Sequence, residues 1–110
     1  MTRLLACTLV ALALTVGCSN STGPNGTGVT VQDNSFSPSS NTITAGETVT
    51  WTWAGSSQHN VTWDSGSPAA SATQASGTYQ RTFAQAGTYS YHCTIHGSAG
   101  AGMHGTVTVQ

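Results

Sequence analysis

The chain alternates apolar and polar residues with a period of two, a pattern that is typical of β-strands. Val49, Trp51 and Trp53 alternate with threonines, and so do Val107 and Val109 near the end of the chain. No stretch shows helical periodicity. Apolar residues on one face and threonines on the other indicate sheets with one buried face. The pattern therefore predicts an all-β fold, a two-sheet antiparallel β-sandwich.

Seven strands are expected from this alternation. They lie near residues 28–33, 41–44, 47–53, 59–63, 78–83, 88–93 and 104–109. The stretch between residues 65 and 76 is rich in Ser and Ala and is expected to form a loop or a short helix.

Arg81 shares its strand parity with the apolar Tyr79 and Phe83. Its strand is therefore expected either to contain a bulge or to lie at a sheet edge, where the guanidinium reaches out.

Residues 1–17 have the composition of a lipoprotein signal peptide. Arg3 precedes an apolar run that is too short to span a bilayer. Gly17-Cys18 at the end of this run resembles a lipobox, although Thr15 stands where leucine is usual. We therefore expect Cys18 to be lipidated. Ordinary secretory cleavage near the same point is the alternative.

The rest of the chain is expected to form a tether and one small domain. Residues 18–28 consist mainly of Gly, Ser, Asn and Thr, as flexible linkers do. Residues 29–110 are long enough for a single compact domain with a thin core. The predicted location is the bacterial cell envelope, with the exported domain lipid-anchored and facing the periplasm (on the outer membrane, if the organism has one).

The charge of the exported part excludes one class of partner. Without the signal peptide, Arg81 is the only strong base, against Asp33, Glu47 and Asp64, which gives a net charge of −2. The sequence contains no lysine. Because phosphate contacts need clustered Lys and Arg, no nucleic-acid binding is expected.

One cysteine stands close to a set of soft metal ligands. Cys93 is followed by His96 and Met103, and His59 lies upstream. Since Cys7 falls in the signal peptide and Cys18 would carry lipid, Cys93 is the only thiol left in the domain, so no intradomain disulfide is expected. Two imidazoles and a thiolate with a weak thioether form the ligand set of blue-copper sites.

Strand parity predicts where these ligands lie. Cys93 should point inward, His96 should lie in a loop beyond the strand, and Met103 should open the last strand, all at one end of the sandwich. Each residue also has an ordinary structural interpretation: Cys93 as a buried structural thiol, the two histidines as packed or surface residues, and Met103 as core filling. His92 and His104 have the opposite parity and are expected to be solvated.

Five segments of the sequence carry a resemblance to a known family: Phe36-Ser37-Pro38, residues 43–51, His59-Asn60-Val61, residues 87–94 and residues 102–107. Through these segments the sequence resembles the plastocyanin-type cupredoxins. The resemblance implies a cupredoxin-like Greek-key sandwich that holds one mononuclear type 1 copper ion. It implies that His59, Cys93 and His96 are the strong ligands and Met103 the axial one. It also implies that Asn60 ties the two ligand segments together through Thr94, with its backbone N–H pointing at the Cys93 sulfur.

The sequence departs from that family in two places. Six residues separate His96 from Met103, where plastocyanins commonly have four, and we expect the insertion to bulge near Gly97 and Ser98. His92 stands where plastocyanins commonly have an exposed aromatic residue. The first departure puts the axial position of Met103 in question and leaves the other three ligands unaffected.

The expected function is one-electron transfer through Cu(I)/Cu(II) between transient redox proteins of the envelope, by a monomer that is not an enzyme. The edge of His96, surrounded by small uncharged residues, is the expected electron port. Three alternatives are open: a copper enzyme, which would need more histidines than four; a copper chaperone, scavenger or sensor; and a metal-free adhesion domain, which leaves Cys93 unexplained.

Overall fold

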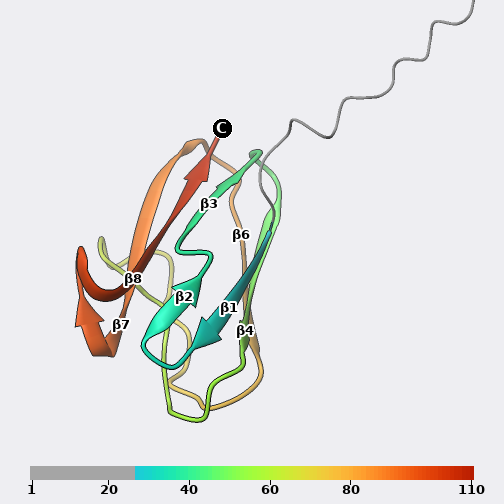
Figure 1. Cartoon of the computed structure of the whole chain (residues 1–110). Helices are drawn as coiled ribbons and strands as arrows, with labels where there is room; N and C mark the ends of the chain where they lie inside the picture. Colours follow the sequence, from blue (N-terminus) through green and yellow to red (C-terminus); the bar gives the residue numbers. More distant parts are fainter. Residues whose placement is uncertain (1–26) are drawn as a thin grey trace, which may run out of the picture.

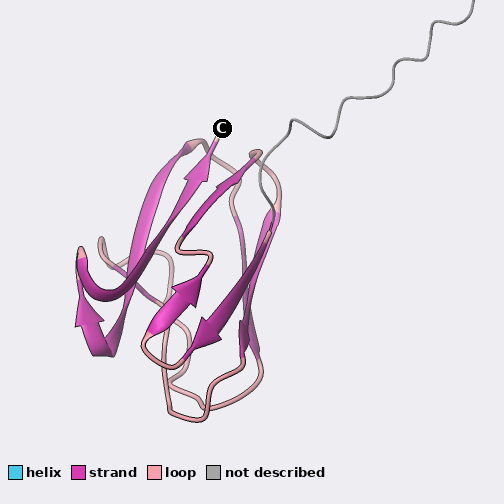
Figure 2. Ribbon diagram, viewed as in Figure 1, coloured by secondary structure: helices cyan, strands magenta, loops and turns pink. Residues whose placement is uncertain are grey.

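The computed structural model describes residues 27–110, which form strands and loops without a helix (Figures 1 and 2). The eight strands are β1 (Gly28–Gln32), β2 (Ser35–Ser37), β3 (Ser40–Ile43), β4 (Thr48–Trp53), β5 (Thr62–Trp63), β6 (Thr78–Thr82), β7 (Gly87–Ser98) and β8 (Ala101–Val109). In this part of the chain there is accordingly no helix able to cross a membrane. The predicted signal peptide, Cys18 and most of the tether lie outside the described residues.

The strands form two four-stranded sheets, and the predicted all-β sandwich is confirmed. One sheet has the order β2-β1-β4-β6 and the other β3-β8-β7-β5. Both sheets are mixed, because β1 pairs with β4 and β3 pairs with β8 in parallel, while the remaining pairs are antiparallel. The chain leaves the first sheet after β2, contributes β3 to the second and returns as β4 beside β1, so the returning strand runs in the same direction as β1.

Alternate residues of each strand fill the space between the sheets. On β4, Val49, Trp51 and Trp53 are buried while the intervening threonines are not. The Trp51 ring makes edge contacts with Trp63 and Tyr91 at centroid distances of 5.7 and 5.4 Å. Such geometry suits the quadrupoles of the rings. The core therefore combines a cluster of contacting aromatic rings with valine side chains.

Two strands differ from the expected elements, and one of the two interpretations of residues 65–76 is correct. β2 was not predicted, because three residues with one buried Phe36 carry too little alternation to be recognised. Of residues 59–63, only the last two form β5, and His59 makes an isolated bridge with Gln74 instead. The stretch between residues 65 and 76 contains no helix, so the loop interpretation is correct.

Arg81 lies at a sheet edge, which was one of the two solutions expected. β6 is the outermost strand of its sheet, and its register with β4 runs without a shift past Val49 and Arg81. The guanidinium donates hydrogen bonds to the Tyr79 hydroxyl (Nε to Oη, 2.9 Å) and to the Ala69 carbonyl (3.0 Å). The aliphatic stem can therefore lie along the core while the charge reaches polar partners.

The β7–β8 pair differs most from expectation. His96 was expected in a loop and instead belongs to β7, and the inserted residues form a hairpin in which Gly97 pairs with Gly102 and Ser98 with Ala101. The expected bulge near Gly97 and Ser98 is wrong, because the register shift lies between His92 and Gly97. Glycine is needed at residue 97, where a Cβ would come within 2.5 Å of the Met103 backbone nitrogen.

Burial of Tyr91 predicts a loss of stability at high pH. Desolvation raises the pKa of Tyr91 from 10.0 to about 12, because the charged phenolate is disfavoured inside the sandwich. The unfolded chain therefore loses this proton first, and the stabilisation present below pH 10 is lost as the pH rises towards 12. We expect Tyr91→Phe to weaken this alkaline decline in urea-unfolding free energy of the metal-free protein. An equally steep decline of the unfolding free energy in the variant would contradict this expectation.

Candidate metal centre

Three predicted ligands converge at one end of the sandwich. The Cys93 Sγ lies 3.9 Å from the Nδ1 atoms of both His59 and His96, and the two Nδ1 atoms are 3.1 Å apart. Bonds of ~2.3 Å to sulfur and ~2.0 Å to nitrogen in a trigonal plane would give edges of ~3.7 and ~3.5 Å. The observed triangle is close to these values. Its size and its thiolate–imidazole donor set therefore fit a copper ion.

The bend in the β7–β8 pair brings Cys93 and His96 to the same point. Between the paired residues His92–His104 and Gly97–Gly102, four residues of β7 stand opposite the single residue Met103 of β8. The longer strand must arch over this position, and the arch contains both Cys93 and His96. Figure 1 shows the bend of the β7–β8 pair at this end. The register shift within β7 thus brings Cys93 and His96 together, for which a loop after the strand was expected.

The three ligands differ in their exposure to solvent. His59 and Cys93 are fully buried, whereas His96 is exposed. Its neighbour Ile95 is half exposed and is the one large apolar side chain on the surface of residues 27–110. One imidazole therefore connects the buried sulfur with the protein surface.

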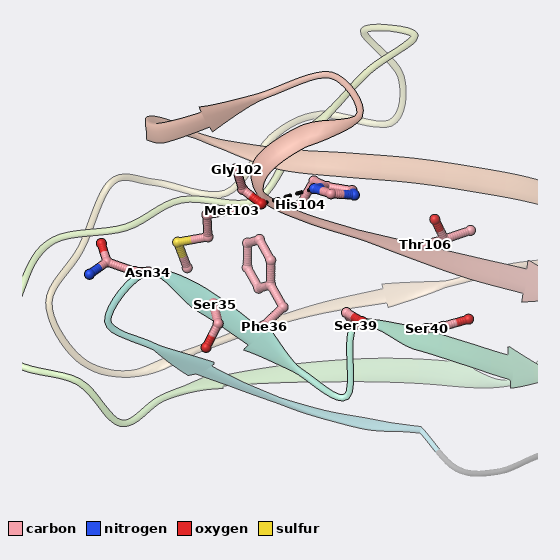
Figure 3. Close-up of a pocket in the computed structure, with 9 residues that line it drawn as sticks. All are labelled: Asn34, Ser35, Phe36, Ser39, Ser40, Gly102, Met103, His104 and Thr106. Atoms are coloured by element: carbon pink, nitrogen blue, oxygen red, sulfur yellow. Dashed lines mark hydrogen bonds between the residues drawn. The ribbon is translucent and has the colours of Figure 1, made fainter.

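Met103 faces the interior of the same end. Its side chain is 1% exposed and extends from β8 towards Asn34 and Phe36 (Figure 3). It lines one side of a surface hollow of about 470 Å³ together with those two residues. Burial is expected both for an axial ligand and for core filling, so the position of Met103 is compatible with either role.

Asn60 joins the two ligand segments, as the resemblance implied. Its Oδ1 accepts a hydrogen bond from the Thr94 backbone N–H at 3.1 Å, and its Nδ2 donates to the Thr94 hydroxyl at 2.9 Å. The same amide also contacts Thr62 and Thr73. Because Thr94 follows Cys93 directly, this network fixes the arch against the segment that carries His59. An N–H bond from Asn60 to the Cys93 sulfur stays a prediction.

Asp33 contacts the candidate ligand His59, which the sequence did not reveal. Its Oδ1 lies 2.9 Å from His59 Nε2, so an ionised carboxylate there must accept the ring proton. This tautomer leaves the Nδ1 lone pair facing Cys93 and His96. Asp33 follows β1, twenty-six positions before His59, and no short-range pattern connects two such residues.

The surroundings of Asp33 favour its charged form. The hydrogen bond with His59, followed by those from the Ser57 and Ser56 backbone N–H groups, holds the pKa of the Asp33 carboxyl far below its usual range. The Ser56 hydroxyl donates a further bond at 3.1 Å. One carboxylate therefore orients the buried imidazole and also closes the loop that leads to it.

Comparison with known proteins agrees with this site. The model of copper-binding proteins of the plastocyanin/azurin family matches residues 25–110. Plastocyanin of Scenedesmus fuscus is 45% identical over 86 residues, covering 68% of this chain and 86% of its own. Plastocyanin A/B of Petroselinum crispum is 40% identical over 85 residues, covering 67% and 86%.

Solved structures give the same result. An oxidized amicyanin variant is similar with a TM-score of 0.64 at 31% identity, over 76% of this chain and 80% of its own. A purple cupredoxin from Nitrosopumilus maritimus, at 24% identity and a TM-score of 0.64 over 77% of this chain and 100% of its own, shows the fold alone. Sequence, sandwich and donor set agree, and the chain belongs to the plastocyanin/azurin family of copper-binding proteins.

Proposed function

We propose that this protein is a one-electron carrier whose single type 1 copper ion is held by His59, Cys93 and His96. The observation that carries the proposal is the triangle of one sulfur and two Nδ1 atoms, with edges of 3.1 to 3.9 Å. Copper bound there would supply a Cu(I)/Cu(II) couple. Asp33 and Asn60 hold two of these ligand segments in place without the metal, which limits rearrangement between the two redox states.

Electrons would enter and leave through the exposed edge of His96. Ile95 beside it and the small residues of the hairpin, Gly97 to Gly102, provide an apolar and uncharged surface. Transient redox partners bind through small interfaces, which a surface of this kind suits. We propose that the protein acts as a monomer, with transient redox proteins of the cell envelope as partners.

The proposed place of action is the bacterial cell envelope, with Cys18 as the lipid anchor. Support comes from the composition of residues 1–17 and from the tether that follows.

A catalytic role is the first alternative. A copper-containing nitrite reductase from Thermus scotoductus is similar to this chain with a TM-score of 0.61 at 28% identity. The similarity covers 74% of this chain and 22% of the reductase. Within residues 27–110, one group of three or more His, Cys, Asp or Glu side chains lies close enough together to hold a metal ion, and it consists of His59, Cys93 and His96. This supports electron transfer rather than copper catalysis.

Copper titration of residues 19–110, followed by visible and EPR spectroscopy, tests the proposal. One equivalent should give an intense thiolate band with narrow copper hyperfine splitting, and the site should cycle reversibly with a chemical reductant and oxidant. A pale complex would overturn the assignment of Cys93. Ready transfer of copper to a metal-free acceptor protein, without reversible cycling, would favour the chaperone, scavenger or sensor alternative.

Met103→Leu tests the axial role of Met103. If the thioether donates weakly to Cu(II), its loss should leave the visible band in place and raise the reduction potential, because the oxidised ion loses a donor. Leucine has a similar volume, so the cost in stability should stay below about 1.5 kcal/mol. Cyclic voltammetry on an electrode measures the shift. An unchanged potential would show that Met103 only fills the core.

A further inference from the structure

Two histidines that the copper centre does not use stand side by side on the outer face of the second sheet. His92 of β7 and His104 of β8 are direct cross-strand partners. Their sequence neighbours Cys93 and Met103 point into the sandwich, so these two side chains point outward. Figure 3 shows Met103 and His104 leaving β8 in different directions.

Each of these imidazoles is fixed through the same ring atom. His92 Nδ1 lies 2.6 Å from Asp64 Oδ1, and His104 Nδ1 lies 2.9 Å from the Gly102 carbonyl oxygen (Figure 3). A carbonyl and an ionised carboxylate only accept hydrogen bonds, so Nδ1 carries the proton in both rings. In neutral rings the lone pairs are then on the two Nε2 atoms.

This is the arrangement in which histidines bind metals. A ligating imidazole usually donates its other N–H to a carboxylate, a backbone carbonyl or water, which sets the tautomer and orients the ring. His92 has the first kind of partner and His104 the second. Cβ atoms of directly opposite residues lie about 4.5–5.5 Å apart, and two Nε2 atoms can then meet one ion at about 2.0–2.1 Å.

From this geometry we infer a second, surface metal site, in which the Nε2 atoms of His92 and His104 bind one divalent cation of borderline softness such as Zn²⁺ or Cu²⁺. Water completes the coordination, because the site is open to solvent. Asp64 acts as a positioning residue that holds the His92 ring. The site is separate from the copper centre and does not depend on the proposed electron transfer.

A zinc titration of the copper-loaded protein tests this inference. Copper occupies the first centre and Zn²⁺ is lower in the order of metal affinities, so added Zn²⁺ reports on the second site. Isothermal calorimetry should show one zinc equivalent with the visible band unchanged. NMR of the reduced, diamagnetic protein should show shifts of the His92 and His104 ring protons.

Variants assign the ligands. His92→Gln and His104→Gln should each remove zinc binding at this site, and Asp64→Asn should weaken it by about 10–100-fold, the usual effect of losing the partner of a ligating histidine. Thr108→Ala, on the same face of β8 and directly opposite Thr88, is the matched control and should bind like the wild type. Zinc binding that is equal in the wild type and in the two histidine variants would overturn the inference, as would its absence in the wild type.

Discussion

Replacing Cys93 by serine is expected to abolish the intense visible absorption of the copper-loaded protein. The band requires a thiolate ligand, and a serine hydroxyl stays protonated near neutral pH and is a poor donor to a soft metal. The remaining imidazoles, with their Nδ1 atoms 3.1 Å apart, can still bind Cu(II), so a pale complex is the expected product. Visible spectroscopy and EPR of the variant measure the loss.

Thr94→Ser is the matched control for this experiment. It lies next to Cys93, and serine keeps the hydroxyl and the backbone N–H through which Asn60 holds the arch. The band should therefore persist in Thr94→Ser. A band that survives in Cys93→Ser would show that the buried thiol is structural. Far-UV circular dichroism of both variants separates loss of the ligand from loss of the fold.

Alternation along single strands predicted the fold well, because burial of one face affects every second residue. Thr48–Trp53 and Met103–Val109 show this directly: buried and less buried residues alternate along both. Alternation does not predict whether neighbouring strands pair in parallel or antiparallel. The parallel pairing of β1 with β4 depends on the crossing of β3 into the other sheet, and periodicity within a strand contains no information about its neighbour.

The candidate site was predictable to the extent that its residue types are unusual. A single thiol with two histidines and a methionine at suitable spacing indicates copper in any fold that brings them together, and the structure brings His59, Cys93 and His96 together. The shape of the β7–β8 pair was harder to predict from the sequence. Its hairpin depends on glycines at residues 97 and 102, where a Cβ would lie within 2.7 Å of the opposite backbone, and such close approach appears only in three dimensions.

Asp33→Asn is expected to weaken copper binding and to raise the reduction potential. Loss of a carboxylate partner of a ligating histidine typically costs about 10–100-fold in metal affinity. The Asp33 charge, 2.9 Å from His59 Nε2, stabilises the more positive oxidised state of the site, so its removal should favour Cu(I). Each tenfold change in that equilibrium appears as about 59 mV. Competition with a chelator and voltammetry measure the two effects.

Glu47→Gln is the control that separates orientation of His59 from a general change in charge. It removes one negative charge as well, from the turn between β3 and β4, where the Glu47 carboxylate accepts a bond from the Thr44 N–H. Hydrogen bonds join that turn to Gln110, which follows the far end of β8 from Met103. Charges separated by more than about 8–10 Å in solvent are largely screened, so the Glu47 charge should affect the copper site little. If both variants shift the potential equally, Asp33 acts only through net charge. A shift confined to Asp33→Asn, together with weaker binding, would assign to Asp33 the task of holding the buried imidazole in its ligating tautomer.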